Sequence, residues 1–405
     1  MKVEVLKLDN FGRGITYIND KICFIENALP NEVVEIEIIK ETSKYIEGKV
    51  LNYIKKSPLR IEEECPYSNI CGGCNLNHIC FNEENKFKLN KVKSIMKKYA
   101  KIDSSLVKGK IDSSLVKGII YHDRNHYRNK IILHGKDNSL GLYKENTNEI
   151  IPISSCLIVN PKINEIIKVL NNTSKEIEEV IIKTSNDNSK VMVKITGTIE
   201  DTSILEKLCD VLIINNKYIS KDKVIETNIG NKKYIEGIDS FFQINNTLTK
   251  ELYDEVLLNI KDKNYNKCLD LYCGTGTIGI YISDQVKEVI GVDYNKSNIN
   301  DAEENKKLNN ISNISFICDK VENKIDTFND IDLVIVDPPR AGLDSKTKEY
   351  LKQINSKKII YVSCDPVTLA RDIKDLDTYK VKYIKVFNMF PRTYHCESVC
   401  ILERR

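Results

Sequence analysis

A change in hydrophobic pattern beyond Ser240 most constrains the fold of this chain. From there to the C-terminus, short apolar strand-like segments alternate with helix-like segments, which predicts a parallel, doubly wound α/β sheet. The segment 267–279 is an apolar strand that breaks into a turn containing Gly274, Gly276 and Gly279 before a helix begins. Ligands of such sheets bind at the carboxyl ends of the strands. We therefore expect the chemistry of residues 240–405 to lie at that edge.

The rest of the chain divides into two further units. Residues 1–56 contain short strands separated by Gly and Asn-Asp turns, which suits a small OB-like β-barrel or an unspecialised β cap. Residues 57–239 hold a cysteine-rich stretch, a lysine-studded helical segment and several strands, and are predicted to form a central α+β domain. Nine residues at 101–109 recur unchanged at 110–118, a local duplication to which we assign no function.

The charge of the chain is balanced overall but locally basic. Sixty-one Lys and Arg residues face 58 Asp and Glu residues, giving a net charge of +3. Residues 86–130, however, carry eleven lysines and two arginines against three acids, so we expect a phosphate-facing surface and an RNA partner. No apolar run approaches the ~18 residues that a membrane span needs, and no secretory signal is seen. We expect a cytoplasmic monomer with no membrane partner.

Several acidic residues follow predicted strands and suggest a cofactor site. The Gly-rich turn alone fits NAD, FAD or S-adenosylmethionine. Asp270, at the strand end before the turn, would repel a pyrophosphate but attract a cationic sulfonium, which favours S-adenosylmethionine. Asp293 follows a second apolar strand at the spacing of a ribose-binding acid. Asp337 ends another strand and is followed by two prolines that hold the loop extended.

A thiol and a carboxylate are predicted to meet near this site. Cys364 follows the strand 358–362 and lies in a polar loop closed by Pro366, where a thiol is accessible. Asp365 would raise the pKa of that thiol, so its activation must come from elsewhere. In methyltransferase-type sheets the last strand runs antiparallel beside the strand that carries the thiol. We therefore expect Glu397, at the start of the last strand, to lie near Cys364.

Taken together, these motifs resemble those of the bacterial RNA (uracil-5-)-methyltransferase family, in its 23S ribosomal RNA branch with a TRAM domain and an iron-sulfur cluster. The resemblance covers nearly the whole chain. It implies an N-terminal TRAM barrel, a central RNA-binding domain and a Rossmann-like S-adenosylmethionine-dependent methyltransferase domain. The motifs that carry it are Phe242-Gln243-Ile244-Asn245, Asp270-Leu271-Tyr272-Cys273-Gly274-Thr275-Gly276, Asp337-Pro338-Pro339-Arg340, Ser363-Cys364-Asp365-Pro366 and His395-Cys396-Glu397-Ser398.

The resemblance also implies a role for each matched position. The cofactor-binding residues would be Gln243, Tyr272, Asp293 and Asp337, the nucleophile Cys364 and the general base Glu397. Asp319 occupies an adenine-side position in many methyltransferases, but its surroundings depart from the family's Gly-containing form, so it is left out of the site. Because uracil C5 is a poor nucleophile, a thiolate that adds to C6 explains the need for a cysteine, and the carboxylate would remove the C5 proton. The target uridine must be unpaired or flipped to be reached.

Three closely spaced cysteines indicate thiolate ligation of a metal. Five residues separate Cys65 from Cys71, and two separate Cys71 from Cys74. Spacing alone nominates Cys80 as the fourth ligand of a compact zinc-like site. The family resemblance instead nominates Cys156 and a [4Fe-4S] cluster, which we favour over zinc, with a structural or RNA-organising role.

The resulting hypothesis is a 23S rRNA (uracil-5-)-methyltransferase. One alternative is a tRNA (uracil-5-)-methyltransferase, and another is a non-catalytic RNA-binding or folding factor. A cytosine-5 enzyme shares the thiol logic but would need different contacts to the edge of the base.

Overall fold

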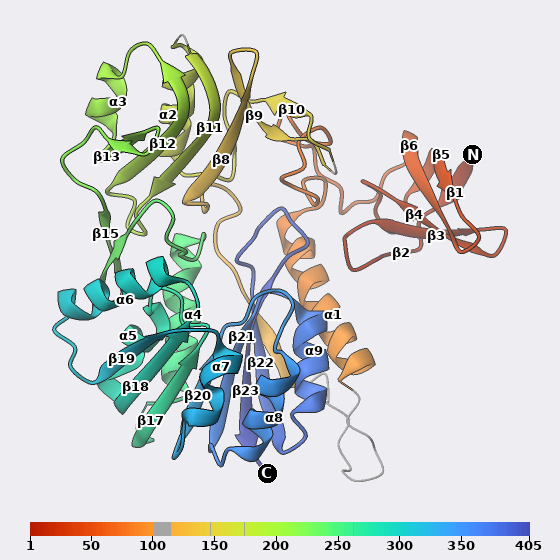
Figure 1. Cartoon of the computed structure of the whole chain (residues 1–405). Coiled ribbons are helices and arrows are strands. Elements are labelled where there is room, and N and C mark those ends of the chain that lie inside the picture. Colours follow the sequence, from red (N-terminus) through yellow and green to blue (C-terminus); the bar gives the residue numbers. More distant parts are fainter. Residues whose placement is uncertain (101–114, 146, 174, 262) are drawn as a thin grey trace.

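The structure is a computed structural model that describes residues 1–100, 115–145, 147–173, 175–261 and 263–405. The first 14 residues of the tandem duplication, 101–114, therefore lie outside the described residues. Figure 1 shows three β-rich bodies: the N-terminal strands in red, a middle sheet in yellow and green, and a C-terminal sheet in teal and blue. Helix α1 (Phe81–Tyr99) runs alongside the C-terminal sheet, below the N-terminal body in this view.

The N-terminal body is a six-stranded sheet that closes on itself. Its strands are β1 (Lys2–Glu4), β2 (Lys7–Leu8), β3 (Gly14–Ile18), β4 (Lys21–Ile25), β5 (Val33–Glu41) and β6 (Tyr45–Lys55), in the order β1-β5-β6-β4-β3-β2. The two edge strands are consecutive in the chain. Between them, the Val5 amide donates to the Glu32 carbonyl and the Leu6 amide to the Ile15 carbonyl. This short segment therefore joins both edges and makes a small barrel.

The middle body is a seven-stranded sheet covered by two helices. The strands are β8 (Lys130–Lys136), β9 (Ser139–Tyr143), β10 (Ile150–Pro152), β11 (Lys175–Thr184), β12 (Val191–Ile199), β13 (Val211–Ile214) and β14 (Lys217–Tyr218), in the order β10-β9-β8-β11-β12-β13-β14. Helices α2 (Pro161–Asn171) and α3 (Ser203–Leu208) bury apolar side chains against one face. Pro161 at the helix start and the Asn160 side chain, which accepts from the Lys162 amide, explain where α2 begins.

The C-terminal body is an eight-stranded sheet in the order β19-β18-β17-β20-β21-β23-β22-β7. Its strands are β7 (Val116–Ile120), β17 (Tyr265–Leu271), β18 (Val286–Asp293), β19 (Ile314–Cys318), β20 (Leu333–Val336), β21 (Lys358–Ser363), β22 (Tyr379–Phe387) and β23 (Glu397–Arg404). The α-helices are α4 (Asn246–Leu258), α5 (Thr277–Ile282), α6 (Lys296–Leu308), α7 (Val321–Lys324), α8 (Ser345–Gln353) and α9 (Pro366–Asp375). Strands β17 to β21 are parallel, and β23 inserts antiparallel between β21 and β22, as predicted.

Helices cover both faces of this sheet, so the parallel strands are buried on both sides. Helices α4 and α5 contribute to the core on one face, and α1, α8 and α9 to the core on the other. Among the helices in the described part of the chain, none combines the length and the apolar character needed to cross a membrane.

Residues assigned from sequence to the central domain are distributed over more than one body. Strand β7 (Val116–Ile120) pairs in parallel with β22 and extends the C-terminal sheet. The apolar stripe of α1, with Val92, Ile95 and Met96, packs into the core of that sheet. The hairpin of β15 (Ile225–Ile229) and β16 (Lys232–Glu236) packs into the core on the other face of the same sheet, through the buried Tyr234. An apolar helix stripe needs a packing partner and an open sheet edge needs a pairing strand. Helix α1 packs into the core of the sheet, and β7 pairs with its edge strand β22.

Candidate active site

Five candidate functional residues lie at the same edge of the C-terminal sheet. Asp270 is the penultimate residue of β17, Asp293 ends β18 and Asp337 follows β20. Cys364 follows β21, and Glu397 begins β23. In the antiparallel pairing of these two strands, Ser363 lies opposite Ser398, so Cys364 and Glu397 are brought side by side at the rim. Their predicted convergence therefore has a geometric basis in the strand register.

The Gly-rich turn after β17 forms an open backbone cradle. Tyr272, Gly274 and Gly276 all adopt positive φ angles. A Cβ atom at Gly274 would meet no other atom within 4 Å, whereas a Cβ atom at Gly276 would overlap the Phe316 ring. The turn thus presents free space on one side and packs tightly on the other. Its position is secured by the Gly274 amide, which donates to Asp293 Oδ2 at 3.1 Å.

Asp270, Asp337 and Glu397, three buried carboxyl groups at this edge of the sheet, have raised pKa values. Burial, followed by repulsion from Asp337, raises the pKa of Asp270 to about 8. Burial raises the pKa of Asp337 to about 7. Burial and then the Asp337 carboxylate raise the pKa of Glu397 well above its usual range, although the Arg340 guanidinium opposes this effect. Buried carboxylates with few positive partners favour a cationic ligand, so the residues present fit a sulfonium cofactor.

Two residues expected to contact the cofactor have other contacts in the structure. Gln243 lies just before α4, where its backbone carbonyl accepts from Asn129 Nδ2 at 3.0 Å. The Tyr272 hydroxyl donates to Asp344 Oδ2 at 3.4 Å, and its ring packs against the core. Asp319, which was left out of the site, accepts locally from the Lys320 amide at 2.8 Å.

Cys364 opens into a cavity of about 190 Å³ that is built from several parts of the chain. Burial, followed by repulsion from Glu397, raises the pKa of the Cys364 thiol to about 12, while Arg340 lowers it. The walls include two barrel residues between β2 and β3, one lysine of α1 and the start of α9. The lining residues are Asn10, Phe11, Lys91, Arg340, Cys364, Asp365, Pro366, Val367, Tyr394, His395 and Cys396.

Sequence reasoning assigned no role to several residues of this cavity. Arg340 was quoted within a motif, but its proximity to both Cys364 and Glu397 required the fold. Phe11 lies in a Phe-Gly-Arg-Gly turn, and an exposed aromatic residue near an arginine was the signal that could have identified it. The ring of Phe11 contacts that of Tyr394 edge to face, with centroids 5.3 Å apart.

In its described part, the basic run 86–130 is not a continuous surface, so that prediction is wrong in part; Lys101, Lys108 and Lys110 lie outside the described residues. Lys88 is fully buried and donates to Glu84 and Asn388. Lys91 is largely enclosed and donates to the Tyr394 carbonyl at 3.0 Å. Arg124 donates to the carbonyls of Leu76 and Ile79 at 2.7 and 2.9 Å, respectively. These charges are used to hold chain segments together, because a buried cation needs partners.

The cysteines nominated for a metal site line one cavity of about 300 Å³. They are Cys65, Cys71, Cys74 and Cys156. Cys80, the alternative fourth ligand, does not line it; the Cys80 amide donates to the Leu59 carbonyl, and α1 begins at the next residue. In the described part of the chain, no group of three or more His, Cys, Asp or Glu side chains is arranged as a ready metal site.

Comparisons with known proteins agree with this architecture. A model of the tRNA (uracil-5-)-methyltransferase family matches residues 204–405, and a TRAM domain model matches residues 1–51. An uncharacterised RNA methyltransferase of Aquifex aeolicus is 32% identical, with the alignment covering 100% of this chain and 98% of that protein. One from Clostridium tetani is 33% identical over 96% of this chain and 93% of that protein.

A solved structure extends the likeness to the fold. The Pyrococcus abyssi tRNA (uracil-54, C5)-methyltransferase in complex with S-adenosyl-L-homocysteine superposes with a TM-score of 0.79 at 23% identity. The match covers 99% of this chain and 100% of that chain. The sequence matches and the arrangement of the strand ends lead to one conclusion: the chain belongs to the S-adenosylmethionine-dependent RNA (uracil-5-)-methyltransferase family, with a TRAM domain at its N-terminus.

Proposed function

We propose that this enzyme methylates C5 of a specific uridine in 23S ribosomal RNA through a covalent bond between Cys364 and C6 of the base. The observation that supports the proposal is the register of β21 and β23, in which Ser363 pairs with Ser398 and Cys364 and Glu397 are the next residues at the rim. Repulsion from Glu397 also contributes to the raised pKa of the Cys364 thiol. Methylation of an exocyclic nitrogen would need no thiol, so this pair favours chemistry at a ring carbon.

The cofactor would be held at the cradle formed by the Gly-rich turn and the acidic strand ends. Asp293 and Asp337 would supply acceptors, with Gln243 and Tyr272 at the edges of the site. When bound, S-adenosylmethionine supplies an electrophilic methyl group on a cationic sulfur. Its positive charge fits the buried Asp270 and Asp337, whose pKa values are raised.

Cys364 and Glu397 would act in sequence on the uracil ring. Addition of the Cys364 thiolate to C6 raises the electron density at C5, the atom that receives the methyl group. The Glu397 carboxylate then accepts the C5 proton, the C5–C6 double bond re-forms, and the bond from C6 to sulfur breaks to release the thiolate. Arg340, which lowers the pKa of both groups, favours the ionised forms that these steps need.

The second cavity would hold a [4Fe-4S] cluster on Cys65, Cys71, Cys74 and Cys156. All four thiols line one cavity of about 300 Å³, and four cysteine thiolates are the usual ligand set of a [4Fe-4S] cluster. No step of the methyl transfer needs this group, so its proposed role is structural.

The choice of 23S rRNA rests on the barrel and the cysteine cavity that accompany the methyltransferase domain, features that resemble the ribosomal branch of the family. Transfer RNA is the second candidate, because the superposed Pyrococcus abyssi enzyme is named for uridine 54 of tRNA. Transfer of a labelled methyl group to unmodified 23S rRNA and to unmodified tRNA, followed by mass mapping of the modified uridine, decides between them. A cytosine product would reject the proposed reaction.

Two active-site variants test the covalent mechanism. Cys364→Ala is expected to abolish methyl transfer while RNA binding persists, because only the nucleophile is removed. Glu397→Gln is expected to accumulate an RNA adduct that survives a denaturing gel, because the last proton cannot be removed. Cys318→Ala is the matched control, since Cys318 is an exposed thiol that ends β19, a strand separated from β21 by β18, β17 and β20. Normal turnover of Cys364→Ala would refute the mechanism.

A further inference from the structure

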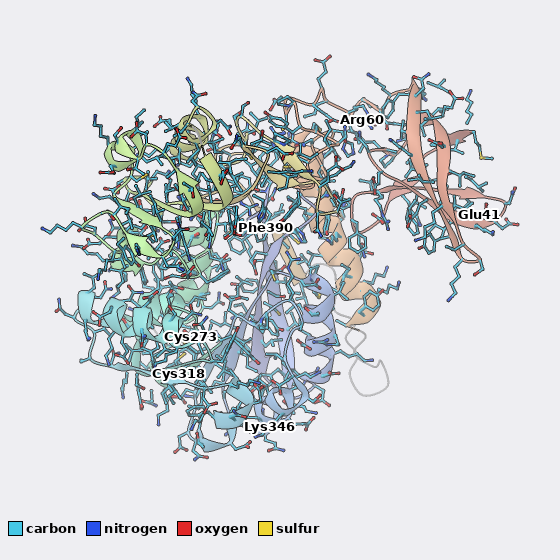
Figure 2. The ribbon with its side chains drawn as sticks, turned by 45° about the horizontal axis from the view of Figure 1, so that its top comes forward. Glu41, Arg60, Cys273, Cys318, Lys346 and Phe390 are labelled. Atoms are coloured by element: carbon cyan, nitrogen blue, oxygen red, sulfur yellow. The ribbon has the colours of Figure 1, made fainter. Side chains whose placement is uncertain are left out.

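A buried arginine lies in the connection that leads into Glu397. Residues 388–396 join β22 to β23, and Arg392 lies in the middle of this connection with a side chain only 1% exposed. Its φ angle of 68° lies in the left-handed region, which a non-glycine residue rarely adopts. A strained conformation persists only where surrounding contacts impose it. Phe390, two residues earlier, lies near the centre of the molecule (Figure 2).

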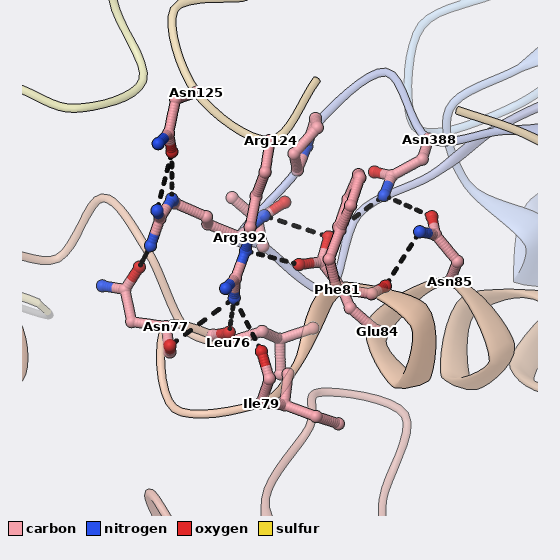
Figure 3. Close-up of polar contacts among 12 residues, drawn as sticks. Leu76, Asn77, Ile79, Phe81, Glu84, Asn85, Arg124, Asn125, Asn388 and Arg392 are labelled. Atoms are coloured by element: carbon pink, nitrogen blue, oxygen red, sulfur yellow. Dashed lines mark hydrogen bonds and ion pairs between the residues drawn. The ribbon is translucent and has the colours of Figure 1, made fainter. Parts of the chain in front are cut away.

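The guanidinium of Arg392 is fully engaged by side chains from two distant segments. Its Nε and Nη2 atoms donate to Asn125 Oδ1 at 3.0 and 2.6 Å. Nη1 donates to Asn77 Oδ1 at 3.0 Å, and Nη2 also donates to Glu64 Oε2 at 2.7 Å. Figure 3 shows the guanidinium between Asn125 and Asn77. The planar fork of arginine suits such divided contacts, and lysine has no equivalent geometry.

The backbone of Arg392 is held as well. Its amide donates to Glu84 Oε1 of α1 at 3.0 Å. Its carbonyl accepts from the amides of Asn75 and Leu76 at 3.0 and 2.9 Å, and these two residues directly follow Cys74. Arg392 thus joins the cysteine-bearing segment and α1 to the active-site connection.

Helix α1 holds the rest of the connection through buried polar contacts. Lys88 Nζ donates to Asn388 Oδ1 at 2.6 Å and to the Phe390 carbonyl at 2.9 Å. Asn388 Nδ2 donates to Glu84 Oε1 at 3.1 Å (Figure 3). The connection is therefore secured at both its first residue and its centre.

Glu397 itself has few contacts that could set its position. The carboxyl oxygen Oε1 is buried without a hydrogen-bond partner among the described residues. From Glu397 onward, pairing with β21 and β22 holds the strand. On the other side, the placement of Glu397 depends on residues 388–396.

We infer that Arg392 is a positioning residue that sets Glu397 for removal of the C5 proton. This inference rests on the proposed covalent mechanism and deepens it. Loss of the Arg392 contacts would let the connection shift, while Cys364, which follows β21, would keep its place. The first bond to C6 would then form, and release of the product would slow.

The test is an adduct measurement on Arg392→Gln, which removes the charged fork but keeps a polar side chain. Turnover is expected to fall about tenfold or more, up to the ~10²- to 10⁴-fold that general-base catalysis contributes. The rate of forming the RNA adduct is expected to stay close to that of the native enzyme, so the steady-state fraction of trapped adduct rises. Arg392→Lys keeps the charge, so its turnover and its trapped fraction are expected to lie between those of the native enzyme and those of Arg392→Gln.

Matched variants separate positioning from stability and from failure of the mechanism itself. Arg60→Gln removes a largely buried arginine fork outside the connection 388–396, which contacts Glu32 at 2.6 Å, and is expected to leave the trapped fraction unchanged. Asn125→Ala provides a milder variant if Arg392→Gln does not fold, and is expected to trap adduct too. Suppose that Glu397→Gln traps adduct. If the Arg392 and Asn125 variants then lose adduct formation to the same extent as turnover, the inference is overturned. No adduct in Glu397→Gln would instead reject the proposed mechanism.

Discussion

Burial raises the pKa values of two carboxyl groups at the active-site edge. Asp337 and Asp270 have pKa values of about 7 and 8, compared with about 3.9 for a free aspartate. In each case the charged form is disfavoured until a positive charge arrives nearby. Asp319, which is only partly buried and accepts from a neighbouring amide, has the opposite shift, because hydrogen bonds from Asn323 and Lys320 lower its pKa. Asp270 and Asp337 can therefore lose protons when a cation binds, whereas Asp319 is already ionised near neutral pH.

Binding of S-adenosylmethionine is expected to release protons at acid pH. At about pH 6 both raised carboxyl groups carry protons, and an approaching cation lowers their pKa values, so up to about two protons leave. At about pH 9 both groups are already ionised, and release should fall to near zero. Calorimetry in two buffers with different ionisation heats measures this number. Asp319→Asn should leave it unchanged; equal proton release at the two pH values would contradict the assignment.

At the scale of elements, the strand ends were predictable and the partners of α1 were not. Each motif follows an apolar strand, so the edge that holds Asp270, Asp337 and Cys364 could be inferred from local pattern. The family, the TRAM domain and the antiparallel last strand are confirmed. The burial of Lys88 could not be inferred, because its partner Asn388 lies 300 residues away. A lysine in a basic run has the same sequence signature whether it faces solvent or a distant amide oxygen.

The cysteine-bearing segments provide a prediction at this same scale. If the proposed cluster is bound, Cys156→Ala is expected to purify anaerobically without iron and sulfide, because Cys156 lines the shared cavity. Cys80→Ala is the matched control and should retain both, since Cys80 lies at the start of α1, outside that cavity. Metal analysis and the charge-transfer absorbance measure the outcome. Zinc in the native protein would replace the cluster assignment, and loss of metal in Cys80→Ala alone would reverse the choice of fourth ligand.

At the scale of the whole molecule, the barrel contributes to the active-site cavity. The turn between β2 and β3 supplies Asn10 and Phe11 to the cavity that Cys364 lines. Phe11 is 53% exposed although its edge contacts Tyr394, so part of the ring remains open. Arg13 lies 5.5 Å from the Phe11 ring centroid and adds positive charge beside it. An open aromatic ring next to a cation is typical of surfaces that stack single-stranded bases.

Phe11→Ala is therefore expected to weaken RNA binding more than chemistry. Stacking on an aromatic side chain contributes about 1–3 kcal/mol per base, so KM for RNA should rise roughly 5- to 150-fold, with kcat changing much less. Steady-state kinetics on an RNA fragment that contains the target uridine measure both constants. Tyr17→Ala is the matched control, because Tyr17 is equally exposed at 53% on the same barrel but does not line the cavity. An equal rise in KM for both variants would show that the barrel binds RNA diffusely rather than through the turn beside Cys364.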